Sequence, residues 1–269
     1  MQVKNKVAVV TGAGSGIGQA LAQTLARRGC QLALADVNAR SLHTTAELLA
    51  GYKVKVSQHV LDVADRAAVA ALPAAVLEAH GHVDMLVNNA GVALSGTFEQ
   101  TSEADFDWLM DINFHGLVRM TRAFLPLLRQ RPQARIVNVS SLFGLISPPG
   151  QSAYSASKFA VRGFSNALRL ELEKTKVGVT VAHPGGIATA IATSARVSDK
   201  MGAEEAARHQ ALAQKMLRMP PDRAAEIIVR AVERGQARVL VGMDAKILAL
   251  LERLMPVHYW RLLARGANK

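Results

Sequence analysis

Residues 7–18 read Val-Ala-Val-Val-Thr-Gly-Ala-Gly-Ser-Gly-Ile-Gly, which predicts a strand, a glycine-rich turn and the start of a helix. Val7–Val10 is a continuous apolar run of the kind that is buried in parallel sheets. The glycines let the backbone approach a pyrophosphate, and the helix N-terminus offers free N–H groups. Asp36 follows at the end of the next apolar run, where a carboxylate can bind ribose hydroxyls. A tight turn with a helix cap is the alternative, but the four features together favour a dinucleotide site.

Apolar runs alternate with helical patterns along the rest of the chain. This alternation predicts an α/β fold: one Rossmann-type domain over residues 1–269, with a doubly wound parallel sheet of about seven strands and helices on both faces. The first helix should run to Arg28, with Gly29 as its C-cap, and one long helix should cover about Asp105–Arg129. The strands are expected at Val7–Val10, Gln31–Ala35, Val54–Val60, Met85–Val87, Ile136–Val139, Gly178–His183 and Arg238–Val241.

Composition and charge limit the possible partners. The chain has 269 residues and a formal charge of +11, but its arginines are scattered, and no helix-turn-helix or zinc-ligand spacing is present. A basic surface that attracts anionic cofactors is therefore favoured over nucleic-acid binding, and we expect no metal site. The single cysteine, Cys30, suits a reducing compartment. No apolar run is long enough to span a membrane, and no signal-peptide pattern is found, so a cytoplasmic protein is expected.

Tyr154 and Lys158 are four residues apart in a predicted helix, so they share one face. An ammonium beside a phenol should lower the pKa of the phenol and make it a proton donor and acceptor near neutral pH. Ser141 follows the preceding strand, and its hydroxyl could hold a carbonyl oxygen if the fold brings it to this pair. Taken alone, the pair also fits a surface tyrosine in an ordinary helix.

In these ordered motifs the chain resembles the short-chain dehydrogenase/reductase superfamily, over roughly Lys6 to Val241. Ser141, rather than Ser140, matches the catalytic serine because it stands thirteen residues before Tyr154. The resemblance implies a catalytic tetrad of Asn113, Ser141, Tyr154 and Lys158. It implies cofactor contacts from Gly12, Ser15, Gly16, Ile17, Gly18, Asp36, Asp62, Val63, Asn89, Ala90, Gly91, Tyr154, Lys158, Pro184, Gly185, Ile187 and Thr189.

The resemblance also implies a role for each of these groups. Tyr154 would transfer a proton to or from the substrate oxygen, and Lys158 would lower the pKa of the tyrosine and hold the nicotinamide ribose. Ser141 would hydrogen-bond the substrate oxygen. Asn113 would position a water that links Lys158 to solvent, or it could merely fix a helix kink. Thr189 would anchor the carboxamide, or it could cap a helix.

Asp36 bears on the choice of cofactor, because a 2′-phosphate beside it would meet a like charge. NAD is therefore favoured and NADP is possible. Arg40 is basic but stands four residues beyond Asp36, where solvent is the expected partner. The resemblance places Asp62 at the adenine ring.

Residues 190–220 match the family's mobile substrate lid and carry several methionines and leucines. Such a helix fits core, interface or lid, and as a lid it would give an apolar pocket. We therefore expect a hydrophobic secondary alcohol or ketone as substrate, with Arg196 and His209 as possible charged exceptions.

The C-terminal tail, residues 244–269, contains an apolar stripe at helical spacing, and Pro256 should end its first helix. Tyr259 and Trp260 follow, and they fit a membrane anchor, a subunit contact or packing across the substrate cleft. We expect the tail to pack on protein rather than on lipid, and the protein to be a homodimer or homotetramer.

Three functional readings remain. The first is an NAD-dependent oxidoreductase acting on a hydrophobic alcohol or ketone. The second is an NADP-dependent carbonyl reductase. The third is a catalytically silent dinucleotide-binding scaffold, and it is disfavoured because such relatives typically lose the tyrosine or the lysine, both of which this chain keeps.

Overall fold

A seven-stranded sheet, parallel throughout, forms the centre of the computed structural model, which describes residues 1–267 and the side chains as far as Leu263. Its strand order is β3-β2-β1-β4-β6-β7-β9. The strands are β1 (Val7–Thr11), β2 (Gln31–Asp36), β3 (Val56–Val60), β4 (Met85–Asn88), β6 (Ala134–Val139), β7 (Val177–Pro184) and β9 (Arg238–Val241). The chain moves outward from β1 to one edge and then from β4 to the other, so the predicted doubly wound sheet is confirmed.

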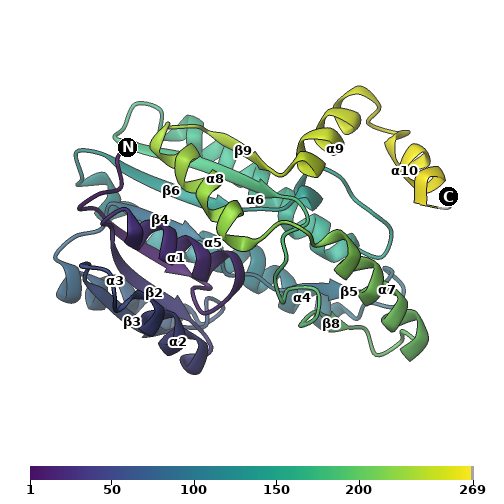
Figure 1. Cartoon of the computed structure of the whole chain (residues 1–269), viewed down its shortest axis with the longest axis horizontal. Coiled ribbons are helices and arrows are strands. Elements are labelled where there is room, and N and C mark those ends of the chain that lie inside the picture. Colours follow the sequence, from purple (N-terminus) through teal and green to yellow (C-terminus); the bar gives the residue numbers. More distant parts are fainter. Residues whose placement is uncertain (268–269) are drawn as a thin grey trace.

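Helices cover both faces of the sheet (Figure 1). One face packs against α1 (Gly16–Arg27), α2 (Ala39–Leu49) and α8 (Pro221–Glu233). The other packs against α3 (Arg66–His80), α5 (Leu117–Arg129) and α6 (Ser152–Glu171). Strands that are buried on both faces explain why β1 and β4 read as unbroken apolar runs rather than as alternating patterns.

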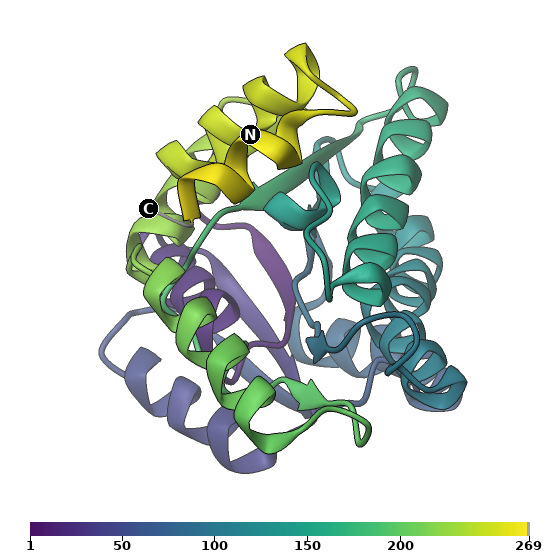
Figure 2. The same cartoon turned by 90° about the vertical axis from the view of Figure 1, so that its right-hand side faces the viewer.

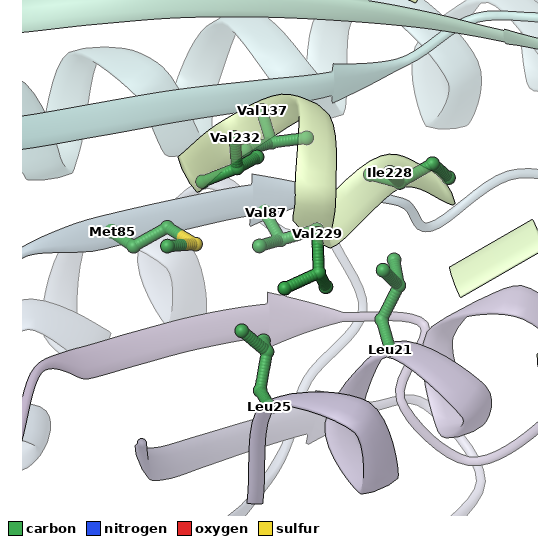
Figure 3. A pocket seen from close by; sticks show the side chains of 8 residues that line it. All are labelled: Leu21, Leu25, Met85, Val87, Val137, Ile228, Val229 and Val232. Atoms are coloured by element: carbon green, nitrogen blue, oxygen red, sulfur yellow. The ribbon is translucent and has the colours of Figure 1, made fainter. Parts of the chain in front are cut away.

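The core between α1, α8 and the sheet is tightly filled. A void of about 10 Å³ remains there, and Figure 3 shows the apolar side chains that line it, among them Leu21, Val87 and Ile228. Its size and its apolar lining leave it as a packing defect and not as a ligand site.

The predicted helix over Asp105–Arg129 is wrong in one respect, because the structure divides this region into three segments. These are α4 (Glu103–Met110), the π-helical segment η1 (Asp111–Gly116) and α5. Asn113 lies in η1, and π-helical turns inside α-helices are frequent at functional sites. The third strand also begins at Val56, two residues later than predicted.

A second, two-stranded sheet pairs β5 (Leu94–Ser95) with β8 (Arg196–Val197). Figure 2 looks onto the end of the molecule where this small sheet lies, together with α7 (Ala203–Met216) and the tail helices α9 (Met243–Leu254) and α10 (Tyr259–Ala267). The carboxyl ends of the central strands open toward this end, which is where ligands bind in folds of this kind.

The tail consists of two helices separated around Pro256, as the sequence predicts. The last two residues of the tail, 268–269, lie outside the described residues. Within residues 1–267, no helix combines the length and the apolar character needed to cross a bilayer.

Candidate active site

The turn between β1 and α1 can form only with glycines. Gly12 has a φ of +64°, and a Cβ on Gly18 would stand 1.9 Å from the carbonyl oxygen of Gly12. Because Gly18 has no Cβ, the N-terminus of α1 can pack directly against the turn. Ser15 is the N-cap residue, but its side chain caps none of the described backbone N–H groups. The first N–H groups of α1, from Gly16 to Gly18, therefore remain available to an anion.

The end of β4 holds this turn in place. Nδ2 of Asn89 donates hydrogen bonds to the carbonyl oxygens of Thr11 (3.0 Å) and Gly12 (3.1 Å). The hydroxyl of Thr11 accepts from the backbone N–H groups of Asn89 and Ala90. Asn89 therefore supports the glycine turn through its side chain, and this second function was not part of the sequence prediction.

Asp36 lies at the end of β2, directly against the same turn. Its Oδ2 accepts a hydrogen bond from the N–H of Gly14 at 2.8 Å, and its Oδ1 accepts from Asn38 at 2.9 Å. Asp62 is exposed after β3 and accepts from the N–H of Ala64. Val63 is buried among core side chains, so any contact between Val63 and a cofactor would have to come from its backbone.

Residues 184–189, which follow β7, return to the glycine turn. A Cβ on Gly16 would lie 3.1 Å from Cγ2 of Thr189, so these two predicted cofactor residues are neighbours. Ile187 is buried, whereas Gly185 lies partly open beside α9. The backbone N–H of Gly186 donates to Oδ2 of Asp244 at 2.6 Å. Asp244 was missed in the sequence analysis, although an acid in the first turn of a helix that follows Gly242 was an available signal.

Ser141 and Tyr154 lie on opposite sides of the loop between β6 and α6, and the fold brings them together. Oγ of Ser141 accepts a hydrogen bond from the N–H of Phe143 at 3.1 Å, which leaves the O–H able to donate to a second partner. The rings of Phe143 and Tyr154 meet edge to face at 6.1 Å. Tyr154 therefore lies within hydrogen-bonding reach of the Ser141 hydroxyl.

Lys158 lies one turn along α6 and is almost completely buried. Its Nζ is 5.6 Å from the centre of the Tyr154 ring. A Cβ on Gly91 would lie 3.2 Å from that Nζ and 3.1 Å from Oδ1 of Asn113, so Gly91 stands in close contact with both groups. Asn113 and Lys158, two members of the predicted tetrad, therefore lie close to each other on either side of Gly91.

Asn113 is held by η1 and by its neighbours. Its Oδ1 accepts from the N–H of Val92 at 2.8 Å, and its Nδ2 donates to the carbonyl of Val92 and to Oγ of Ser157. These bonds occupy most of the hydrogen-bonding capacity of a buried amide. Asn113 thus lies within the helix irregularity and also close to Lys158, so its position fits both alternatives from the sequence.

The predicted lowering of the Tyr154 pKa by Lys158 is wrong for this structure. The apolar surroundings raise the pKa of the phenol because they disfavour the phenolate, and the hydrogen bond with Ser141 only partly opposes this. Burial lowers the pKa of Lys158 to about 8. The prediction from the sequence considered only the nearby charge, because the loss of water around the two groups depends on packing that the sequence does not show.

Residues 190–217 form a flap whose two ends are fastened together. Ile187 bridges to Met219, and the N–H groups of Arg218 and Met219 both donate to the carbonyl of Gly186. None of the residues of α7, all of which are described, is buried. The alternative that this helix is core is therefore wrong, and its position fits a lid or an interface.

The side chains around Tyr154 are apolar. Leu94, Leu109 and Ala153 form a buried cluster against which Val92, Phe106, Trp108 and Tyr154 pack. Arg196, a possible substrate ligand on sequence grounds, is already engaged: it binds Asp105 at 2.7 Å and stacks on Trp108 at 3.8 Å. His209 faces Oγ of Ser95 at 3.4 Å.

Part of the tail packs on its own chain, as predicted. Ala245 is completely buried, and the hydroxyl of Tyr259 accepts a hydrogen bond from the N–H of Ser147 in the loop ahead of Tyr154. Of the predicted apolar stripe Ile247, Leu250, Leu251 and Leu254, all but the partly buried Leu251 are exposed by more than half, as is Met243 at the start of α9. Among the described residues, no group of three or more His, Cys, Asp or Glu side chains could hold a metal ion.

The fold and these motifs define an α/β protein with a doubly wound parallel sheet, a glycine turn after its first strand and a tyrosine-lysine pair. The chain belongs to the short-chain dehydrogenase family, whose sequence profile matches residues 6–200. It is similar to the protein SadH of Mycobacterium tuberculosis, with 45% identity over 99% of this chain and 96% of the relative. It is also 34% identical to dehydrogenase/reductase SDR family member 7B of Bos taurus, over 99% of this chain and 83% of that protein.

Solved structures agree with this assignment. A short-chain dehydrogenase/reductase from Burkholderia phymatum in complex with NAD superimposes with a TM-score of 0.85 and 31% identity, covering 94% of both chains. A short-chain dehydrogenase from Streptomyces avermitilis gives a TM-score of 0.84 and 32% identity, covering 99% of this chain and all of that one.

Proposed function

We propose that this protein is an NAD-dependent oxidoreductase that interconverts a hydrophobic secondary alcohol and its ketone, with Tyr154 as the acid/base. The single observation that carries the proposal is the contact between Ser141 and Tyr154: the serine hydroxyl hydrogen-bonds the phenol, while its oxygen accepts from the N–H of Phe143. A hydroxyl and a phenol that converge in this way can both hydrogen-bond one substrate oxygen.

The residues present fit NAD. The uncapped N-terminus of α1 and the glycine turn would hold the pyrophosphate, and Asp36 would bind the adenosine ribose. Asp62 would contact the adenine, Asn113 would hold a water beside Lys158, and Thr189, next to Gly16, would hold the nicotinamide carboxamide. Bound NAD would supply the hydride acceptor for the alcohol carbon. The Burkholderia relative with NAD bound supports this choice.

The reaction then requires a proton to move at one atom, the substrate oxygen. Ser141 holds that oxygen, and Tyr154 takes its proton when the alcohol is oxidised or returns it when the ketone is reduced. Lys158 lies one helical turn away, with its Nζ 5.6 Å from the centre of the Tyr154 ring, and would hold the nicotinamide ribose. The raised pKa of the free phenol suits a donor that holds its proton until the substrate and cofactor are in place.

The apolar cluster around Tyr154 supports a hydrophobic substrate, because Arg196 is paired with Asp105 and is not free to bind a carboxylate. NAD is favoured over NADP because Asp36 would oppose a 2′-phosphate, while Arg40 is exposed in the first turn of α2. Because Arg40 is basic and exposed near Asp36, the NADP-dependent carbonyl reductase remains the second candidate.

A homodimer or homotetramer is our proposal for the assembly, with the exposed stripe of α9 packing on protein rather than on lipid. A cytoplasmic location stays a prediction. Light scattering of the wild type and of Ile247→Glu tests the first point: the charge should lower the mass of the assembly, and an unchanged mass would contradict a role of α9 in it.

The function is tested by following NADH absorbance over a panel of secondary alcohols, with NAD and NADP compared at equal concentration. We expect turnover of medium-sized apolar alcohols with NAD. Absence of turnover across the panel, in both directions and with both cofactors, would contradict the proposed function.

A further inference from the structure

His183 is a completely buried histidine at the carboxyl end of β7, directly behind the proposed catalytic serine. Its Nδ1 is 3.0 Å from the carbonyl oxygen of Ser141. Since a carbonyl can only accept, Nδ1 must carry the proton and donate it. The other ring nitrogen, Nε2, is buried and has no hydrogen-bond partner among the described residues.

The backbone ladder between β6 and β7 ends beside this histidine. β6 and β7 pair through Val139 and Ala182, and the N–H of Ser140 donates to the carbonyl of Ala182. The next residue of β7 that would donate back to β6 is Pro184, which has no N–H. The missing donor would have served the carbonyl of Ser140, so the backbone ladder ends there, and the bond from the imidazole of His183 to the carbonyl of Ser141 is a side-chain contact just beyond the ladder.

The loop that carries Ser141 is held from the other side by α6. Oγ of Ser140 donates to the carbonyl of Lys158 at 2.8 Å, and a Cβ on Gly144 would lie 2.3 Å from that Oγ. The loop is therefore hydrogen-bonded on one side to His183, through the carbonyl of Ser141, and on the other side to α6, through Oγ of Ser140. Removing either contact would allow the peptide of Ser141 to rotate.

His183 is kept neutral by its surroundings. Burial lowers its pKa to about 4; the hydrogen bond to the Ser141 carbonyl opposes this shift, and the positive charges of Arg238 on β9 and Arg162 on α6 add smaller lowering effects. An apolar residue would fill this place without leaving a buried nitrogen unpaired, which is costly. The presence of a histidine therefore needs a reason beyond packing.

We propose that His183 is a positioning residue: through its bond to the Ser141 carbonyl it sets the direction in which the Ser141 hydroxyl points toward Tyr154 and the substrate oxygen. This inference rests on the proposed function. Neither the family match nor the motifs of the sequence analysis assign a role to this residue.

Two substitutions distinguish the effect of the hydrogen bond to Ser141 from the effect of the side-chain volume of His183. His183→Leu fills the site without a donor, and His183→Asn places an amide N–H close to the position of Nδ1. We expect His183→Leu to lower kcat by about 10- to 100-fold, the scale of a misplaced catalytic group, with the dissociation constant of NAD within about twofold of wild type. His183→Asn should recover most of kcat.

Thr180→Val is the matched control, because it removes buried hydrogen bonds from the same strand. Oγ1 of Thr180 donates to the carbonyl of Gln236 and accepts from Arg135, away from Ser141. This variant should lower the melting temperature and leave kcat close to wild type. An equal loss of kcat in Thr180→Val and His183→Leu would show that β7 stability alone matters and would overturn the proposal.

A second readout does not depend on activity. The hydrogen bond with Ser141 lowers the pKa of Tyr154, so displacing Ser141 should raise that pKa. Ultraviolet titration of the tyrosines, with Tyr154→Phe subtracted to assign the signal, should show a higher pKa in His183→Leu and the wild-type value in His183→Asn. An unchanged Tyr154 titration in His183→Leu would overturn the proposal even if the wild type turned over no substrate. A wild type without turnover but with the expected titration shift would contradict the proposed function only.

Discussion

Asp36 accepts a hydrogen bond from the backbone N–H of Gly14 at 2.8 Å, which joins the end of β2 to the centre of the glycine turn. A Cβ on Gly14 would stand 3.0 Å from that carboxylate, so the two residues are in close contact. Asp36 therefore has two functions that a substitution must separate: it shapes the turn, and its charge opposes a 2′-phosphate.

Asp36→Asn separates them, because the amide oxygen can still accept from Gly14 while the negative charge is lost. We expect the preference for NAD over NADP, measured as the ratio of kcat/KM values, to narrow by about tenfold, or about 1.4 kcal/mol. Arg40→Ala is the control and should leave the ratio unchanged. A wild type that prefers NADP, with the preference lost in Arg40→Ala, would contradict this account.

Gly18→Ala should abolish NAD binding, because the added methyl group would stand 1.9 Å from the carbonyl of Gly12 and α1 could not close on the turn. Calorimetric titration with NAD measures this loss. Gly163→Ala is the control: no described atom outside its own helix turn lies within 4 Å of the new methyl, so it should bind NAD normally and gain up to about 1 kcal/mol of stability. Normal NAD binding by Gly18→Ala would show that the turn is not the cofactor site.

The sheet could be predicted from the sequence because buried parallel strands leave an unmistakable apolar pattern, as in Val7–Val10 and Met85–Val87. The division of the helix around Asn113 could not, since apolar spacing hardly distinguishes a π-helical turn from a regular one. The pairing of Leu94 with Arg196 could not be predicted either, because strands of two residues are too short to show a periodic pattern in the sequence.

His183 should make the protein sensitive to acid. Its pKa is lowered from the ordinary 6.5 to about 4 in the folded protein, so the unfolded chain binds a proton first as the pH falls. The free energy of unfolding should therefore decrease between about pH 6.5 and pH 4, by up to about 3 kcal/mol from this residue, and be unaffected by it above that range.

The contribution is measured as the difference in urea unfolding between wild type and His183→Asn across this pH range. This difference removes the parallel effects of His59 and His80, whose pKa values are also lowered by burial. Equal pH dependence in the two proteins would contradict the neutral, buried state of His183.

Asn113→Ala should destabilise the protein as well as slow it. The substitution leaves the N–H and carbonyl of Val92 and the hydroxyl of Ser157 without their partner, which should cost about 2–4 kcal/mol of unfolding free energy. Ser157→Ala removes only one of these bonds and should cost about 1 kcal/mol. If Asn113→Ala keeps full stability and loses only kcat, the residue acts solely in the proton relay and not on η1.

The candidate site was predictable where a motif fixes residue type and spacing, as for Tyr154 and Lys158. It was not predictable where distant segments supply one contact each. Asp244 reaches Gly186 across 58 residues, and His183 reaches Ser141 across 42. The predicted direction of the Tyr154 pKa shift was also wrong, because desolvation depends on tertiary packing that a helical sequence pattern does not reveal.

The central claim is that Tyr154 moves the proton of the substrate oxygen, and it is tested most directly by NADH formation from NAD and a hydrophobic secondary alcohol in wild type and Tyr154→Phe. The account predicts turnover by the wild type and a loss of about 10²- to 10⁴-fold in kcat in the variant, with the dissociation constant of NAD nearly unchanged. Near-normal turnover by Tyr154→Phe would contradict it.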